Sequence, residues 1–414
     1  LSTQAAFGRI LFDLAKSDAL DQQVDLLRAS ISAFENGRYV TYPFDIETSR
    51  SLYKALLDPV SERLASKDHL IFEPDGAMLR LPINLLVVDD RSVSEYLARV
   101  DQPDGDPFNY TEIQWLGGNT NISTAVSARG FADARKAPIS KASRQYLGLG
   151  SNQPVLANTR IGGVRASTEG LNANCNWSLN EWNKPISDAE LFQARSIIGK
   201  NGSDVLTGSA FSDDQILAKS DISDYRILHF ATHGLVTAPR PSCPAKPALL
   251  TSFGGGNSDG LLAFDEIFDL KLDADIVILS ACDTAGKASI QATREAGVSS
   301  GGGTALDGLV RSFIGAGSRS VLASHWPAPD DFRATERLIG GLFADGKGQS
   351  VATALRISQK KLMDDPVTSH PYYWSGFAII GDGSRPFLPG DQSSNKSADS
   401  ARSSASDKTI SPLK

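Results

Sequence analysis

Cysteine is scarce in this chain: its 414 residues include only Cys175, Cys243 and Cys282. Three cysteines cannot build the disulfide framework of a small secreted domain, and none stands in a CxxC pair of the kind that binds zinc. We therefore expect a reducing compartment and favour the cytoplasm. Export stays open as an alternative, because the chain begins with Leu1 and looks like a processed form or a fragment. An exported form is expected to carry a Cys175–Cys243 bridge and to leave Cys282 free.

Long apolar runs and clusters of positive charge are also missing. The longest apolar stretch, residues 81–88 (LPINLLVV), is far shorter than the ~20 residues that span a bilayer, so we expect no membrane anchor. Acidic residues outnumber lysine and arginine by 48 to 41, and no basic stripe is visible. That charge does not fit a protein that binds nucleic acid. The apolar content of 41% is enough for a large buried core.

The chain does contain an alternation of apolar strands and amphipathic helices between residues 37 and 386, which predicts an α/β fold around a mostly parallel sheet. Residues 1–36 show only a helical pattern and look like the end of a longer region. Residues 387–414 are rich in serine and poor in apolar side chains, so a disordered tail is expected. The expected strands are 69–73, 146–149, 225–232, 275–280, 320–325 and 377–380, and the expected helices are 48–65, 185–198, 212–218, 304–314, 331–343 and 350–363.

Two of the expected strands end in residues that can do chemistry. The run 225–232 (YRILHFAT) is followed by His233 and Gly234, and the run 275–280 (DIVILS) leads into Cys282. In an open α/β sheet the ligand site lies beyond the carboxyl ends of the strands, so neighbouring strands would bring the imidazole and the thiol together. An imidazole raises the thiolate fraction of a nearby cysteine and can return the proton to a leaving amine. The backbone N–H groups of Gly234 and Cys282 would then stabilise the oxyanion.

His229 and His233 stand four residues apart, and three interpretations compete: a metal pair, a core histidine beside a catalytic one, or no function. The histidine pair of zinc proteases lies on a helix and needs a glutamate after the first histidine, where this chain has Phe230. His229 falls inside an expected strand, which favours a buried structural histidine. His233 follows the strand and precedes a glycine, which favours a catalytic role. The chemistry expected here needs neither a metal nor a cofactor.

The chain resembles a known family, the CHAT domains, which are caspase-like cysteine peptidases often found behind tetratricopeptide repeats. The resemblance is carried by blocks that follow one another in the family's order and span most of the chain. These blocks are 53–59 (YKALLDP), 69–82 (HLIFEPDGAMLRLP), 228–235 (LHFATHGL), 259–267 (DGLLAFDEI), 279–284 (LSACDT), 316–327 (AGSRSVLASHWP) and 370–382 (HPYYWSGFAIIGD).

The resemblance implies a caspase-like three-layer sandwich of helices around a mostly parallel sheet, with His233 and Cys282 as the catalytic dyad. It implies that residues 37–145 form a non-catalytic half of the domain and residues 146–386 the catalytic half. Residues 1–36 would then be the helical remnant of an upstream region, of tetratricopeptide-repeat type in many members of the family.

Substrate preference is less well indicated. The caspase signature Q-A-C-[RQG]-G is replaced here by residues 280–284 (SACDT), so a preference for aspartate is not carried over. Asp283 is read either as a wall of the substrate pocket, which would favour a basic residue before the scissile bond, or as a carboxylate that holds the loop. Trp326 is expected to pack near the substrate cleft or to line it. The glycine-rich stretch 286–303 is longer than in a typical member of the family.

The sequence therefore predicts a cysteine endopeptidase of bacterial CHAT type, which cleaves a protein or peptide substrate through a thioester. Control by an upstream repeat region or a regulatory partner is expected, because an intracellular protease that is always active is harmful. The competing interpretation is a caspase-like interaction or assembly module with an idle dyad.

Overall fold

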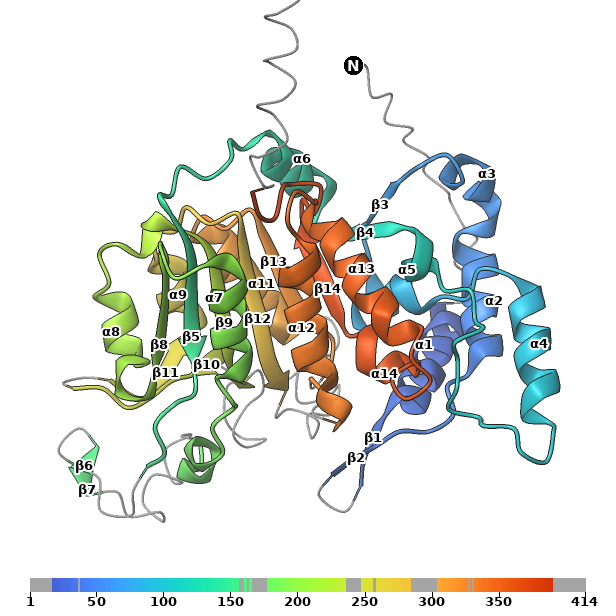
Figure 1. Ribbon diagram of the computed structural model, residues 1–414, viewed down its shortest axis with the longest axis horizontal. Helices are drawn as coiled ribbons and strands as arrows, with labels where there is room; N and C mark the ends of the chain where they lie inside the picture. Colours follow the sequence, from blue (N-terminus) through green and yellow to red (C-terminus); the bar gives the residue numbers. More distant parts are fainter. Residues whose placement is uncertain are drawn as a thin grey trace, which may run out of the picture.

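A single large β-sheet with helices on both faces dominates the computed structural model (Figure 1). The structure describes residues 17–35, 38–155, 160–161, 164–165, 177–235, 247–255, 258–283, 304–326, 328–329 and 331–389.

The described strands are β1 (Ala33–Glu35), β2 (Arg38–Val40), β3 (His69–Phe72), β4 (Asn121–Thr124), β5 (Arg144–Gly150), β6 (Arg160–Ile161), β7 (Val164–Arg165), β8 (Ser203–Thr207), β9 (Tyr225–Leu235), β10 (Ala248–Leu250), β11 (Leu261–Ala263), β12 (Ile276–Asp283), β13 (Ser320–Ser324) and β14 (Phe377–Gly381). The α-helices are α1 (Ser17–Ile31), α2 (Ile46–Leu56), α3 (Ser61–Leu64), α4 (Asp90–Val100), α5 (Leu116–Asn119), α6 (Ala128–Lys136), α7 (Ala189–Ile198), α8 (Asp213–Leu217), α9 (Phe264–Asp269), α11 (Thr304–Gly315), α12 (Ala334–Asp345), α13 (Val351–Met363) and α14 (Pro371–Trp374). Short 3-10 helices include η1 (Asp58–Val60), η3 (Ile83–Leu85), η5 (Leu179–Asn183) and η8 (Asp331–Arg333).

The main sheet has ten strands within the described part of the chain, and β9 and β12 lie at its centre. The strand order is β11-β10-β9-β12-β13-β14-β4-β3, and β5 lies between β8 and β9 beside the first part of β9. Most neighbours are parallel, whereas β10, β11 and β14 run antiparallel to the strands before them. Because β3 and β4 join this sheet at β14, the predicted halves 37–145 and 146–386 share one sheet.

The central strands are buried on both faces, as their continuous apolar runs require. Along β9, Ile227 packs into one core, which also contains Leu338 of α12, and the next residue, Leu228, packs into the other, which contains Phe313 of α11. Since successive side chains of a strand point to opposite faces, the two cores are the two layers between sheet and helices. Figure 1 shows α7, α12 and α13 on one face and α9 and α11 behind the sheet. The predicted α/β sandwich with a mostly parallel sheet is confirmed.

The six expected strands and most expected helices are present, and four expectations need correction. The expected helix 48–65 is divided into α2, η1 and α3, because Pro59, the second residue of η1, lacks the backbone N–H that a continuous helix needs. The helical pattern of residues 1–36 ends in a strand, β1, that pairs with β2. The sequence pattern also predicts an irregular stretch over residues 238–256, but this stretch contains β10, which forms a hairpin with β11.

The fourth correction concerns the tail predicted for residues 387–414. Phe387 and Leu388 are buried in the core, and Phe387 packs against Phe343 with ring centroids 5.2 Å apart. Residues 387–389 therefore belong to the folded part, and the rest of the predicted tail, residues 390–414, lies outside the described residues, as do residues 1–16 at the other end.

Candidate active site

The two chemically important strand ends are neighbours in the sheet. Strands β9 and β12 pair in parallel over eight residues, and the register places Cys282 opposite His233 and Asp283 opposite Gly234. Both residues of the predicted dyad lie within the strands and not past their ends, which corrects the sequence interpretation. The strands continue because β12 keeps pairing with β9 as far as Gly234, and β10 pairs with the end of β9 on its other side.

The imidazole of His233 is half-buried, and one of its two nitrogens is held by a hydrogen bond. Its Nε2 lies 2.6 Å from the backbone carbonyl oxygen of Lys184, which can only accept a hydrogen bond. The neutral ring therefore carries its proton on Nε2 and donates it to Lys184. The other nitrogen, Nδ1, is buried and has no hydrogen-bond partner among the described residues. An imidazole in this state presents a free lone pair, as a general base requires.

The predicted oxyanion-hole residues lie at adjoining positions of the same strand pair. Gly234 is buried at the point where β9 pairs with Leu249 of β10 on one side and with Asp283 of β12 on the other. Cys282 precedes Asp283, so its backbone N–H belongs to the neighbouring strand. The side chains of Cys282 and Asp283, the other two cysteines and the loop 286–303 lie outside the described residues.

His229 is a core histidine, as predicted. It is fully buried, and its Nδ1 lies 3.0 Å from the hydroxyl of Tyr146. Its Nε2 lies 3.3 Å from Oε1 of Glu190, which is ion-pair distance, but the two atoms are not aligned for a hydrogen bond. Burial, with a smaller contribution from the charge of Glu190, raises the pKa of Tyr146, so the phenol stays protonated. Among the residues that the structure describes, no group of three histidine, cysteine or acidic side chains could hold a metal ion.

Trp326, the predicted residue of the substrate pocket, follows β13 and is buried, with 4% of its surface exposed. Its indole N–H donates to the carbonyl oxygen of Tyr372 at 3.0 Å, and its ring lies against Gly376. These contacts make Trp326 a core residue close to the end of β13. Its role in lining the substrate cleft stays a prediction.

Sequence reasoning missed the carbonyl group of Lys184, because every residue has a backbone carbonyl and no side-chain pattern marks the one that binds a histidine. The signal available was indirect. Trp182, two residues earlier, is an aromatic residue in an otherwise polar stretch, NEWNK, and such a residue needs a buried site.

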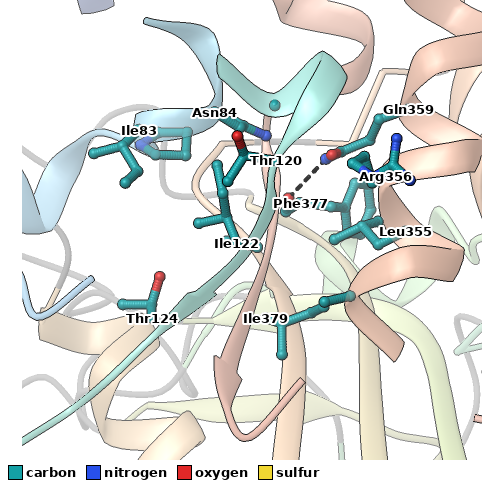
Figure 2. Close-up of a pocket in the computed structure, with 14 residues that line it drawn as sticks. Ile83, Asn84, Thr120, Ile122, Thr124, Leu355, Arg356, Gln359, Phe377 and Ile379 are labelled. Atoms are coloured by element: carbon teal, nitrogen blue, oxygen red, sulfur yellow. Dashed lines mark hydrogen bonds between the residues drawn. The ribbon is translucent and has the colours of Figure 1, made fainter. Parts of the chain in front are cut away.

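A small pocket lies elsewhere in the molecule, between α13 and the strands β4 and β14 (Figure 2). Gln359 of α13 reaches across it and donates to the carbonyl oxygens of Trp374 and Phe377 at 2.9 and 3.0 Å. Asn84 of η3 lines the pocket and has a buried side-chain oxygen without a hydrogen-bond partner within the described chain. His233 and Cys282 do not line this pocket, so it is separate from the candidate active site.

The fold and the site define an α/β protein that presents a histidine and a cysteine at paired positions of two parallel strands. The family model for the CHAT domain matches residues 47–382, and the chain belongs to the CHAT domain family. None of the helices in the described ranges is long and apolar enough to cross a membrane.

Two curated relatives match about half of the chain. Tetratricopeptide repeat protein 28 of Homo sapiens is 26% identical over 229 residues, which is 48% of this chain and 8% of that protein. The protein of the same name from Mus musculus is 25% identical over 232 residues, again 48% and 8%. The chain thus spans a small part of the length of these relatives.

Three solved structures share parts of the architecture. The Arg-specific cysteine proteinase gingipain R has a TM-score of 0.42 at 8% identity, covering 90% of this chain and 75% of that one. The complex of Porphyromonas gingivalis RgpB pro- and mature domains gives 0.43 at 10% identity, with 92% and 79% covered. The Saccharomyces cerevisiae separase–securin complex gives 0.35 at 12% identity, with 64% and 14% covered.

Proposed function

We propose that this chain is a cysteine endopeptidase of the CHAT type, with Cys282 as the nucleophile and His233 as the general base and acid. The observation that carries the proposal is the pairing of Cys282 with His233 in register, together with the state of the imidazole. With Nε2 donating to Lys184, Nδ1, which has no hydrogen-bond partner among the residues described, is the atom proposed to take a proton from the thiol.

The proposed reaction has two stages. The Cys282 thiolate attacks the carbonyl carbon of the scissile peptide bond, and the backbone N–H groups of Gly234 and Cys282 stabilise the oxyanion. The imidazolium of His233 then protonates the leaving amine, so the C–N bond breaks and a thioester remains. Water, deprotonated by His233, hydrolyses that thioester and regenerates the thiol. Asp283, one residue further along β12, is proposed as a wall of the pocket for the residue before the scissile bond.

Regulation by an upstream region or a protein partner is part of the proposal. The relatives are tetratricopeptide repeat proteins by name, and α1 precedes the residues that the family model matches. Burial and, to a smaller extent, the positive charge of Arg28 on α1 lower the pKa of His325, at the end of β13, to about 3. Equal cleavage rates by this chain and by a longer chain with its upstream region would contradict the regulation.

The test is labelling with a library of electrophilic peptides, read by mass spectrometry, on the wild type and on His233→Ala. We expect an adduct on Cys282 alone and its loss in His233→Ala, because the imidazole supplies the base. Cys175 and Cys243 serve as controls within the same molecule. Slow and equal labelling of all three cysteines in both proteins would contradict a catalytic dyad and favour an interaction module. The sequences of the peptides that react would report on the pocket near Asp283.

A further inference from the structure

The group that holds His233 is itself held by a network of buried contacts that the proposed reaction does not use. Lys184 follows the last residue of η5, so the position of its carbonyl depends on how η5 is fixed. Its own side chain is exposed and does not anchor it. The anchoring must therefore come from the residues just before Lys184.

Trp182 is the strongest of these anchors. Its side chain is 2% exposed, and its indole N–H donates to the carbonyl oxygen of Thr251 at 2.8 Å. Its ring lies against Phe253 with centroids 5.0 Å apart. Gly260 packs so closely on the indole that a Cβ there would lie 2.8 Å from Nε1. The position and the orientation of the indole ring are therefore both fixed.

The backbone around Trp182 is tied down as well. The carbonyl oxygen of Trp182 accepts a hydrogen bond from the side-chain amide of Asn152 at 2.8 Å, and Asn152 is buried after β5. The side-chain oxygen of Asn183 accepts from the backbone N–H of Val155 at 3.0 Å. Three hydrogen bonds therefore fix the two residues before Lys184.

Together these contacts form a closed path that begins and ends at the candidate site. Thr251 directly follows β10, and β10 pairs through Leu249 with Gly234, the residue after His233. The path starts at His233, passes through the Lys184 carbonyl, Trp182 and Thr251, and returns to Gly234. Each step along it is a hydrogen bond, a strand pairing or a stretch of the chain. A shift of the indole would therefore change the distance between the Lys184 carbonyl and His233.

We propose that Trp182 is a positioning residue for the reaction: its indole holds the Lys184 carbonyl where it keeps the proton of His233 on Nε2 and leaves Nδ1 as the base toward Cys282. The inference rests on the proposed function. Trp182 does not touch the substrate or the reacting atoms, so its effect passes through Lys184 and His233 only.

The experiment measures alkylation of Cys282 by iodoacetamide between pH 5 and pH 9.5, quantified for each cysteine by mass spectrometry. Its variant is Trp182→Phe, which keeps an aromatic ring and removes the N–H. A carbonyl acceptor stabilises the imidazolium, and the imidazolium stabilises the thiolate. We expect the apparent pKa of the Cys282 thiol to rise, so that alkylation at pH 6.5 slows about tenfold, equivalent to one pKa unit. At pH 9.5, where the thiolate forms without help, the rate should be within about twofold of the wild type.

Two further variants separate positioning from loss of structure. Asn152→Ala removes the donor to the Trp182 carbonyl without touching the indole, and it should slow alkylation at pH 6.5 in the same direction. Trp177→Phe makes the same chemical change in a partly buried residue that packs against the same apolar cluster but is not one of the residues that connect His233, Lys184, Trp182 and Thr251, and it should keep the wild-type pH profile. Thermal unfolding is followed for all three.

The outcomes are distinct. A wild-type pH profile in a folded Trp182→Phe would overturn the inference, and so would a rate loss that is equal at all pH values and shared by Trp177→Phe. If the wild type itself shows no preference for Cys282 and no dependence on His233, the proposed function fails and the inference falls with it. If the wild type passes that test and Trp182→Phe behaves like it, only the positioning role is refuted.

Discussion

At the scale of single residues, the two histidines of LHFATHGL show how burial decides what an imidazole does. His233 is half-buried, and one of its nitrogens has no partner among the described residues. His229, four residues earlier, is fully buried between the hydroxyl of Tyr146 and the carboxyl of Glu190. A buried carboxyl without a nearby partner is unstable, so His229 contributes to stability through Glu190.

Replacing His229 by leucine tests this role. We expect His229→Leu to lower the free energy of unfolding by about 2–4 kcal/mol, because the buried Glu190 carboxyl loses its polar neighbour and the Tyr146 hydroxyl keeps only its longer hydrogen bond, 3.4 Å, to the carbonyl oxygen of Leu191. Urea unfolding at pH 7 measures the change. In the double variant His229→Leu/Glu190→Leu the buried carboxyl is gone, and part of the stability should return. A cost below about 0.5 kcal/mol for the single variant would refute the role, since surface substitutions give changes of that size.

At the scale of the elements, the turn from α11 into β13 depends on Gly317. Its φ is +115°, and a Cβ at this position would lie 2.2 Å from the carbonyl oxygen of Leu272. The segment before β12 therefore packs directly onto the turn that starts β13. Since β12 and β13 are neighbours in the sheet, this contact sets how the strand that carries Cys282 meets the next one.

Gly317→Ala should therefore cost roughly 1–3 kcal/mol of unfolding free energy from backbone strain, with the clash adding to it. Gly255→Ala is the matched control, because a Cβ there meets nothing within 4 Å. Thermal and urea unfolding of both variants measure the difference. Equal stability of the two would show that the turn can relax without cost.

The elements also show what a sequence can and cannot predict. Long apolar runs such as those of β9 and β12 are sufficient for burial on both faces, so these strands could be predicted. Strands β10 and β11 have three residues each, and they exist because β9 offers a partner at its end. The same pairing places His233 inside its strand. The neighbouring positions of His233 and Cys282 could be predicted from the strand pattern, whereas the contact of His233 with the Lys184 carbonyl could not, because that contact depends on the position of η5.

At the scale of the whole molecule, buried neutral histidines link the stability of the fold to pH. His370 connects distant parts of the chain: its Nε2 lies 2.8 Å from the carbonyl oxygen of Tyr42, and its Nδ1 accepts from the backbone N–H of Tyr372 at 3.1 Å. Each nitrogen of the neutral imidazole therefore takes part in a hydrogen bond. Burial lowers the pKa of His370 to about 4, the hydrogen bond to Tyr42 opposing this in part. Burial also lowers the pKa of His69 and of His325.

The sign of the pH dependence follows from these shifts. The folded pKa of His370 is about 4 and the unfolded value is 6.5, so below pH 6.5 the unfolded chain binds a proton that the folded chain does not. The stabilisation is complete above pH 6.5 and is lost as the pH falls from 6.5 toward 4. For His370 alone, the free energy of unfolding should fall by about 2 kcal/mol between pH 7 and pH 5.

Urea unfolding at pH 7 and at pH 5 tests this on the wild type and on His370→Asn, whose amide does not titrate. The variant should be less stable than the wild type at pH 7, because the bond to the Tyr42 carbonyl is altered, but it should lose less stability on going to pH 5. The comparison of the two slopes isolates His370 from His69 and His325, which titrate in both proteins. Parallel pH profiles for the two proteins would mean that the His370 imidazole takes up its proton in the folded state, and that burial at the junction of residues 42 and 372 does not keep it neutral.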